Sequence, residues 1–206
     1  MNRRIITISR EFGSGGRELG KHLAGLLGID YYDREIITAI AEQNGLDEGY
    51  VEMALEKRDW QSMPLTFGRS FAGINGMQQM QTNLLVAQKH VIEGIAKAGK
   101  DCVIVGRNAD VLLADKEPFR MFVCAGMDAK VRRCMERASE GENISRKGVE
   151  QNIRRIDKVR ARTREILGGS KWGEANAYHL TVNTEGWNME ELASAVEEFV
   201  RRWYGR

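Results

Sequence analysis

The sequence is poor in cysteine and has no long apolar run. Its three cysteines, Cys102, Cys124 and Cys134, lie far apart and form no Cys-x-x-Cys pair. Neither a disulfide scaffold nor a structural zinc site is therefore expected, and we expect a cytoplasmic location. A membrane helix needs roughly 20 apolar residues in succession, and no stretch of the sequence approaches that length. Residues 1–8 hold two arginines but no long apolar stretch, so we also expect no signal peptide.

The chain also lacks a surplus of charge. It has 31 Lys and Arg against 29 Asp and Glu, a formal net charge of +2. One segment departs from this balance, because residues 146–164 contain eight basic and two acidic side chains. So dense a charge repels itself unless an anion lies close, although a solvated helix face has the same composition. Since no interleaved aromatic residues and no helix-turn-helix pattern accompany the segment, we do not expect a nucleic acid as partner.

Apolar runs alternate with helical repeats along the 206 residues. Five runs are typical of buried parallel strands: residues 4–9, 29–33, 102–106, 121–124 and 180–183. The alternation predicts one α/β domain with about five parallel strands and helices on both faces of the sheet. Residues 60–82, rich in Gly, Ser, Gln and Met, are expected to form a loop or a flap that orders over a substrate.

A glycine-rich turn separates the first strand from the first helix. This turn, residues 10–16, is called the glycine loop below and ends in Gly13, Ser14, Gly15 and Gly16. Glycines let a ligand approach the backbone closely and leave φ unrestricted. The helix that follows directs its first N–H groups and its positive dipole end toward such a ligand. The pattern indicates a site for phosphate oxygens, although glycine turns after a first strand also occur for structural reasons alone.

Several segments, taken in order, resemble the cytidylate kinase-like family, a divergent branch of the nucleoside monophosphate kinases. They are the run 6–24, Tyr31-Tyr-Asp33, Val105-Gly-Arg-Asn108, Phe122-Val-Cys-Ala125 with Arg132-Arg133, Arg155-x-Asp157-x-x-Arg160, and Val182-Asn-Thr184. The resemblance covers nearly the whole chain and implies a three-layer P-loop kinase-like fold as a single domain over residues 1–206. It also implies an acceptor-binding insertion at about 34–98 and a lid at about 138–166.

The resemblance further implies a phosphotransferase. Such an enzyme would move the γ-phosphoryl group of ATP, with Mg²⁺, to a nucleoside monophosphate, and CMP or dCMP is the acceptor we expect. Nucleotide substrates are then the expected partners, while the oligomeric state is left undetermined. Two alternatives stay open: a kinase for another small-molecule acceptor, and a nucleotide-binding protein without efficient catalysis.

The glycine loop departs from the family where the donor phosphates are normally held. Gly16 stands in the position of the P-loop lysine, and Glu18 is aligned with the Ser or Thr that holds Mg²⁺. Arg17 is the nearest substitute cation, and arginines of the lid are the alternative source of charge. Glu18 either contacts Mg²⁺, directly or through water, or is a first-turn acid that the helix dipole favours. The Mg²⁺ ligands are therefore not identified by the sequence.

Arginines dominate the remaining candidates. Phosphoryl transfer depends on alignment and on positive charge around the moving group, and arginine grips phosphate oxygens bidentately. Arg133 and Arg137 lie four residues apart on one expected helix face, so both can reach one anion, and Arg137 is expected on the donor phosphates. In the lid, Arg155 and Arg160 flank Asp157, which would orient a guanidinium or approach the metal. The candidate catalytic residues are Arg17, Arg133, Arg155, Asp157 and Arg160.

Three residues are expected at the acceptor. Arg107 follows the strand at 102–106, at the carboxyl end of the sheet, where open α/β folds bind ligands. The resemblance implies that Arg107 holds the acceptor's phosphate. Asn108 stands where the family has an acid, which leaves the base that is recognised open. Asp33, at the end of the second strand, is expected beside the acceptor.

Overall fold

The structure, a computed structural model, describes residues 3–56, 71–138 and 145–205 of the chain. Its sheet has the strand order β2-β3-β1-β4-β5, and every neighbouring pair is parallel. The strands are β1 (Ile5–Arg10), β2 (Asp30–Tyr32), β3 (Cys102–Val105), β4 (Phe119–Cys124) and β5 (Leu180–Asn183). The predicted α/β fold with about five parallel strands is confirmed.

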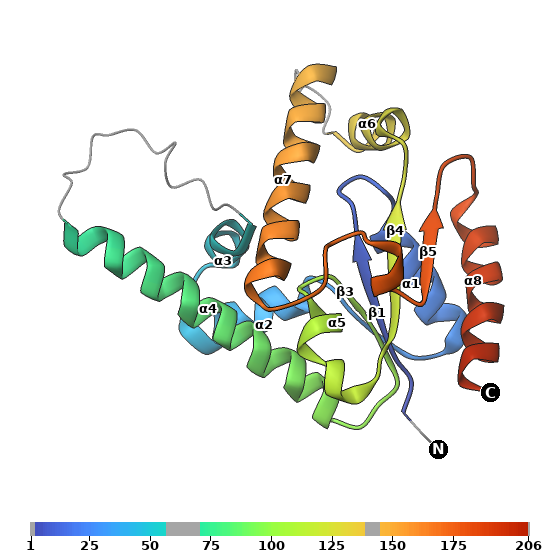
Figure 1. Ribbon diagram of the computed structural model, residues 1–206, viewed down its shortest axis with the longest axis horizontal. Helices are drawn as coiled ribbons and strands as arrows, with labels where there is room; N and C mark the ends of the chain where they lie inside the picture. The colour runs from blue at the N-terminus through green and yellow to red at the C-terminus, as the bar shows by residue number, and fades with distance from the viewer. Residues whose placement is uncertain (1–2, 57–70, 139–144, 206) are drawn as a thin grey trace.

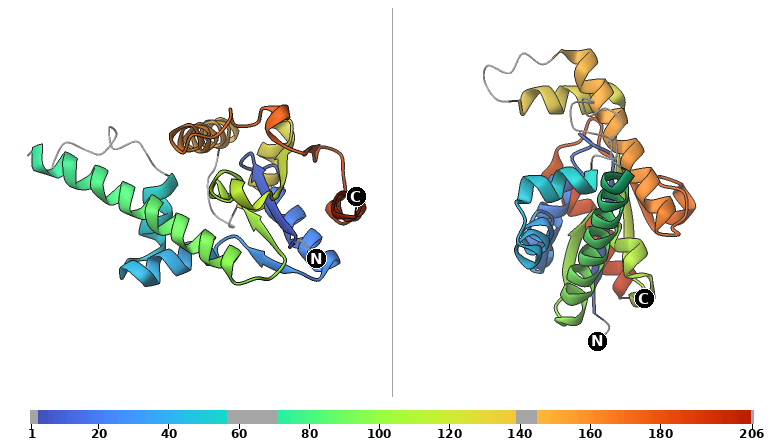
Figure 2. Two further views of the ribbon diagram at one scale, coloured as in Figure 1. Left: turned by 60° about the horizontal axis from the view of Figure 1, so that its bottom comes forward. Right: turned by 90° about the vertical axis from the view of Figure 1, so that its left-hand side faces the viewer.

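Helices cover both faces of this sheet (Figures 1 and 2). They are α1 (Gly16–Leu27), α2 (Glu35–Asn44), α3 (Glu48–Glu56), α4 (Phe71–Lys97), α5 (Ala109–Leu112), α6 (Met127–Glu136), α7 (Arg146–Ile166) and α8 (Met189–Tyr204), with 3₁₀ turns at Ala114–Lys116 and Ala175–Ala177. Within the described ranges, none of these helices combines the length and apolarity that a membrane span requires.

The pleat of the strands separates the two largest clusters of buried residues among those described. Ile6 and Ile8 of β1 are buried on one face, against α1 and α8. Ile5, and Ile104 of β3, are buried on the other face, against α2 and α4. Because successive strand residues point to opposite faces, continuous β-branched runs of this kind are what a sheet covered on both sides requires.

One expectation about the middle of the chain is wrong. The predicted loop or flap at 60–82 is helical from Phe71 onward, because α4 begins there, and residues 60–70 lie outside the described residues. Each glycine costs a helix only about 1 kcal/mol. Extension from the packed part of α4, where Leu84 and Ile92 are buried, gains a hydrogen bond per residue. A low local propensity therefore did not end the helix.

The basic segment forms α7, which stands beside the carboxyl-terminal ends of the strands (Figure 1). Ser145 caps its first turn by accepting a hydrogen bond from the Gly148 N–H. Val149, Ile153 and Ile156 form an apolar stripe along this helix and are buried. Residues 146–166 of the expected lid are thus one helix, whereas residues 139–144 lie outside the described residues.

Candidate functional site

The glycine loop turns sharply from β1 into α1. Gly13 and Gly15 have φ angles of 76° and 83°, in the left-handed region that favours glycine. Space requires glycine as well, because a Cβ atom on Gly13 would lie 2.9 Å from Cys134 Sγ. A Cβ atom on Gly15 would meet the movable end of Met189, 2.4 Å from Cε, so the positive φ is the firmer constraint there. Since α1 begins at Gly16, its first-turn N–H groups lack partners within the helix and face outward with the positive dipole end. The loop is therefore shaped to hold an oxyanion.

Side chains of the protein donate hydrogen bonds to backbone carbonyls of the glycine loop. Arg133 donates from Nη1 to the Gly13 carbonyl at 3.0 Å and from Nη2 to the Thr184 carbonyl at 3.4 Å. The Thr184 hydroxyl donates to the Ser14 carbonyl at 2.6 Å, and the Ser14 hydroxyl to the Glu11 carbonyl at 2.8 Å. These contacts fix the loop's orientation. Arg133, expected at catalysis, thus holds the loop backbone in this structure, and it also lines the cavity in front of the loop.

A cavity of about 450 Å³ opens in front of the loop, and we call it the loop cavity. Five arginines line it: Arg10, Arg17, Arg133, Arg137 and Arg160. The remaining lining comes from the glycine loop, α6 and the first turns of α7: Glu11, Phe12, Gly13, Gly15, Gly16, Cys134, Ala138, Gly148, Val149 and Asn152. With five cations and one carboxylate in its wall, this cavity is suited to a polyanion.

Two ion pairs lie at the helix start. Arg17 pairs through Nε with Asp33, whose side chain is buried, while the Arg17 side chain is 54% exposed. Arg137 pairs through Nη2 with Glu18, and both are partly exposed. An exposed pair such as Arg137–Glu18 is worth little, about 0–1 kcal/mol. Phosphate oxygens can therefore replace Glu18 at small cost, whereas Asp33 is buried and remains beside Arg10 and Arg17.

The eight-residue P-loop pattern, Gly-x-x-x-x-Gly-Lys-[Ser/Thr], also corrects one assignment. Counted from Arg10 at the first glycine, the lysine position falls on Gly16 and the hydroxyl position on Arg17 rather than on Glu18. Neither an ammonium group nor a hydroxyl thus stands at the two positions that normally grip the donor phosphates and Mg²⁺.

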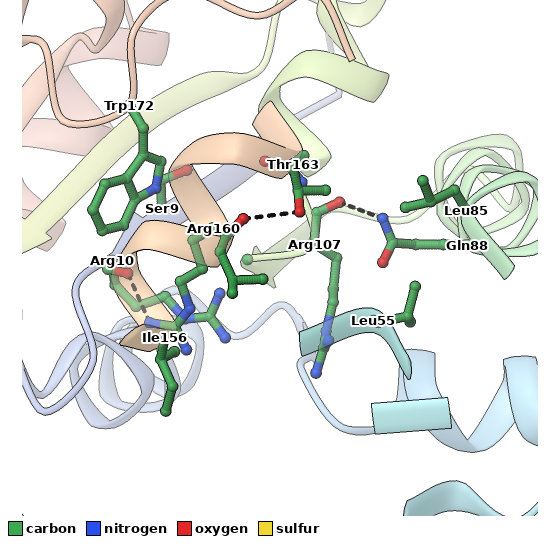
Figure 3. A pocket seen from close by; sticks show the side chains of 13 residues that line it. Ser9, Arg10, Leu55, Leu85, Gln88, Arg107, Ile156, Arg160, Thr163 and Trp172 are labelled. Carbon is green, nitrogen blue, oxygen red and sulfur yellow. Dashed lines mark hydrogen bonds between the residues drawn. The ribbon is translucent and has the colours of Figure 1, made fainter. Parts of the chain in front are cut away.

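A second, smaller cavity of about 50 Å³ lies on the far side of Arg10 and Arg160, which belong to both walls; we call it the inner cavity (Figure 3). Arg107 enters it from the end of β3. Its apolar walls come from α3, α4, α7 and the segment after α7: Leu55, Leu85, Ile156, Val159 and Trp172. The remaining lining residues are Ser9, Gln88, Gly106, Asn108 and Thr163. Three arginines from distant parts of the chain, Arg10, Arg107 and Arg160, therefore line one small space.

The backbone at the inner cavity is strained. Gly106, Arg107 and Asn108 follow one another with φ angles of 74°, 56° and 54°. Non-glycine residues in the left-handed region cost of order 1–3 kcal/mol each and persist where the surroundings enforce them. Here Gln88 donates from Nε2 to the Arg107 carbonyl at 2.9 Å, and the Ala109 N–H donates to the Gly106 carbonyl at 3.1 Å. Such strain gathers at ligand sites, which agrees with the position expected for Arg107 and Asn108.

The α7 helix is docked on the glycine loop. Asp157 accepts a hydrogen bond through Oδ1 from the Phe12 N–H at 2.7 Å, and Arg160 donates from Nη1 to the Arg10 carbonyl at 3.0 Å. Burial raises the pKa of the Asp157 carboxyl to about 6, although the Phe12 N–H and the Arg160 guanidinium oppose the shift. Asp157 and Arg160, which both belong to the expected lid, are therefore brought to the glycine loop.

A lysine that sequence reasoning missed lies below this contact. Lys130 of α6, with a side chain only 7% exposed, donates from Nζ to Glu11 Oε2 at 2.8 Å and lies 4.0 Å from Asp157 Oδ2. A buried lysine needs such carboxylate partners. Its partners come from distant parts of the chain, so spacing on α6 carried no signal for it.

The predicted residues that line neither cavity are Ser14, Glu18, Asp33, Arg155 and Asp157. Glu18, Asp33 and Asp157 each pair with an arginine that lines the loop cavity, and Ser14 bonds within the glycine loop. Arg155 donates from Nη2 to Asn152 Oδ1 at 2.8 Å, along its own helix. The other predicted residues line one cavity or both.

Comparisons with known proteins agree with this fold. The chain is similar to an uncharacterized protein from Eubacterium ventriosum ATCC 27560, with 23% identity, 97% and 99% of the two chains covered and a TM-score of 0.68. It is also similar to shikimate kinase from Bacteroides thetaiotaomicron, with 14% identity, 96% and 98% covered and a TM-score of 0.58. Shikimate kinase from Acinetobacter baumannii, solved in complex with shikimate, shares 15% identity, with 97% and 94% covered and a TM-score of 0.52. At such identities the likeness shows the fold alone.

No curated protein matches the chain. The cytidylate kinase-like family, by contrast, matches residues 5–186, which include the glycine loop, Arg107 and α7. The fold is that of P-loop kinases, and the chain belongs to the cytidylate kinase-like family.

Proposed function

We propose that this protein is a phosphotransferase that moves the γ-phosphoryl group of ATP to a nucleoside monophosphate, with CMP or dCMP as the first acceptor to test. The observation that carries the proposal is the pair of cavities that share Arg10 and Arg160. One is bordered by the glycine loop and the other by Arg107. A donor and an acceptor can therefore approach each other across two cations, which is what in-line transfer requires.

The donor phosphates belong at the glycine loop. The N–H groups at the start of α1 face them, and Arg137 exchanges Glu18 for phosphate oxygens. Arg17, paired with buried Asp33, adds its charge at the exposed rim. Arg160, tied to the Arg10 carbonyl, stands at the boundary with the inner cavity. In the transfer, the bond between the γ-phosphorus and its bridging oxygen breaks and a bond to the acceptor's phosphate oxygen forms, giving ADP and a nucleoside diphosphate.

Phosphotransferases use ATP together with Mg²⁺, so a carboxylate near the loop is needed as a ligand for the metal. Among the described residues, no three His, Cys, Asp or Glu side chains gather to hold a metal. Mg²⁺ needs only one or two carboxylates beside the substrate phosphates and water. Glu18 on α1 fits that need once Arg137 moves to a phosphate. Bound there, Mg²⁺ would neutralise charge on the donor phosphates.

The acceptor belongs in the inner cavity, with its phosphate on Arg107. At about 50 Å³ this cavity is small beside the roughly 150 Å³ that holds a benzene molecule. A nucleoside monophosphate therefore enters only if the walls from α3, α4 and α7 separate. Asp33, buried beside Arg10 and Arg17, is placed to orient groups at this boundary.

A smaller anionic acceptor is the second candidate, favoured by the size of the inner cavity and by Asn108 in place of the family's acid. Nucleotide binding without efficient transfer is the third, favoured by Gly16 at the lysine position.

An acceptor panel separates these candidates. ATP is incubated with each nucleoside monophosphate and with small phosphorylated or carboxylated alcohols, and ADP release is measured. The proposal expects release with CMP or dCMP above the rate with ATP alone. Release with a small alcohol only favours the second candidate. No release with any acceptor, together with a melting temperature raised by ATP, favours binding alone.

A further inference from the structure

Arg10 occupies the position of the first P-loop glycine, and its side chain has a defined path. A Cβ atom on Gly16 would lie 2.7 Å from Arg10 Cβ and 3.2 Å from Arg10 Cγ. A Cβ atom on Gly106 would lie within 1.5 Å of Arg10 Nη1. The side chain therefore crosses Gly16 with its stem and covers Gly106 with its guanidinium, and both neighbours must be glycine for it to lie there.

This path links the two departures from the P-loop pattern. A lysine at position 16 would place its Cβ inside the van der Waals envelope of the Arg10 stem, since 2.7 Å is closer than non-bonded carbons approach. An arginine at position 10 and a lysine at position 16 thus exclude each other in this fold. The absent lysine and the added arginine are one change rather than two.

The Arg10 guanidinium lies where a phosphoryl group would pass. Its side chain is only 10% exposed and belongs to the walls of both the loop cavity and the inner cavity. Asp33 faces it, with Oδ1 at 3.7 Å from Arg10 Nη2, and within the described part of the chain this Oδ1 accepts no hydrogen bond. Asp33 therefore anchors the charge of Arg10 electrostatically, and a charge this buried acts strongly on a nearby anion.

We infer that Arg10 is the catalytic cation that replaces the P-loop lysine. It contacts the γ-phosphoryl group from the strand end of the loop, rather than from the helix start where Arg17 lies. As the γ-phosphoryl group moves from the bridging oxygen of ADP to the acceptor oxygen, Arg10 stabilises the negative charge of the transition state. The inference rests on the proposed function for its donor, ATP, and it adds the source of the missing charge.

The test is a cycle of three variants, Arg10→Gly, Gly16→Lys and the double variant, with Arg10→Lys as the conservative change and exposed Lys21→Ala as the control. Melting temperature, the dissociation constants of ATP and ADP by calorimetry, and CMP-dependent ADP release are measured for each. The ratio of ATP to ADP affinity is the decisive readout, because a merely structural role would change both affinities alike.

We expect Arg10→Gly to lower turnover about 100-fold and to remove most of the preference for ATP over ADP, while ADP binding changes little. Gly16→Lys lowers the melting temperature, because its stem meets Arg10. The double variant regains the melting temperature that Gly16→Lys loses, and it regains part of the preference for ATP over ADP. Arg10→Lys keeps part of that preference.

Two results overturn the inference: an Arg10→Gly protein that keeps the wild-type ATP to ADP ratio, and a double variant whose melting temperature falls by the sum of the single effects. The proposed function fails separately, if wild-type protein prefers ATP but transfers to no acceptor. In that case the affinity ratio still decides the role of Arg10. Wild-type protein that binds neither nucleotide contradicts both.

Discussion

The two ends of α7 use the same residue type in opposite ways. Near its C-terminal end, Arg164 is buried, bonds Asp110 through Nη1 and donates from Nε to the Ser170 carbonyl at 2.7 Å. Near its N-terminal end, Arg146 is 58% exposed and pairs with exposed Asp128 and with Glu150. Between them Arg160 reaches the glycine loop. Although apolar residues are buried along the helix, its arginines differ: Arg164 is a buried anchor, Arg146 lies at the surface and Arg160 contacts the site.

The largest expected effect tests the anchored end. Arg164→Ala leaves the Asp110 carboxylate buried without its cation, and breaking a buried pair in this way costs about 3–5 kcal/mol. We expect the free energy of unfolding, measured by urea denaturation, to fall by that order. Arg146→Ala is the matched control at the exposed end and should leave the melting temperature nearly unchanged. Equal losses for the two variants would contradict the anchor.

The middle of the helix gives the second comparison. Arg160 lines both cavities, whereas Arg155 lines neither and bonds Asn152 of its own helix. Arg160→Ala is expected to lower CMP-dependent ADP release about 100-fold. Arg155→Ala, five residues away, is expected to lower it far less unless α7 rotates during the reaction. Matching losses in the steady-state rates would show that Arg155 reaches the site in another state of the lid.

These contrasts show what the sequence allows one to predict about α7. The apolar stripe and the capping serine are local patterns, so the helix and its buried face follow from residues 145–166 alone. The roles of its arginines depend on Asp110, Ser170 and the loop, which the fold brings from elsewhere. Charge density therefore indicated a phosphate-binding helix. It did not show which arginine is a buried anchor, which contacts the site and which lies at the surface.

The same reasoning explains the rest of the site. The glycine loop was predictable because its geometry depends on glycines at fixed local positions. Lys130 was missed because a lysine on a helix is read as exposed, and its burial depends on Glu11 and Asp157. The role of Arg10 has no local sequence signal, because it depends on the space over Gly16 and Gly106.

The contact between helix and loop should depend on pH. Burial raises the pKa of Asp157 from 3.8 to about 6, so the folded protein holds this proton more tightly than the unfolded chain. Its contribution to stability is therefore complete below about pH 4 and is lost as the pH rises through about 6. Relative to Asp157→Asn, the unfolding free energy of the wild type should fall between pH 4 and 7, by about 1–3 kcal/mol. If urea titrations at pH 4, 5, 6 and 7 give a constant difference in unfolding free energy between the two proteins, the pKa of Asp157 is not raised.

The smallest effect is expected at the exposed rim of the loop cavity. Arg17→Ala removes a cation that is 54% exposed and already paired with Asp33, so the affinity for ATP measured by calorimetry should fall only a few-fold, about 1 kcal/mol or less. Lys21→Ala, one turn further along α1, is the control and should leave the affinity unchanged. Because exposed charges are screened, the effect of Arg17→Ala should shrink as the salt concentration rises. The effect of a cation buried beside Asp33 should persist in high salt. An effect of Arg17→Ala that does not change with salt concentration would therefore show that Arg17 acts in the interior of the site and not at its rim.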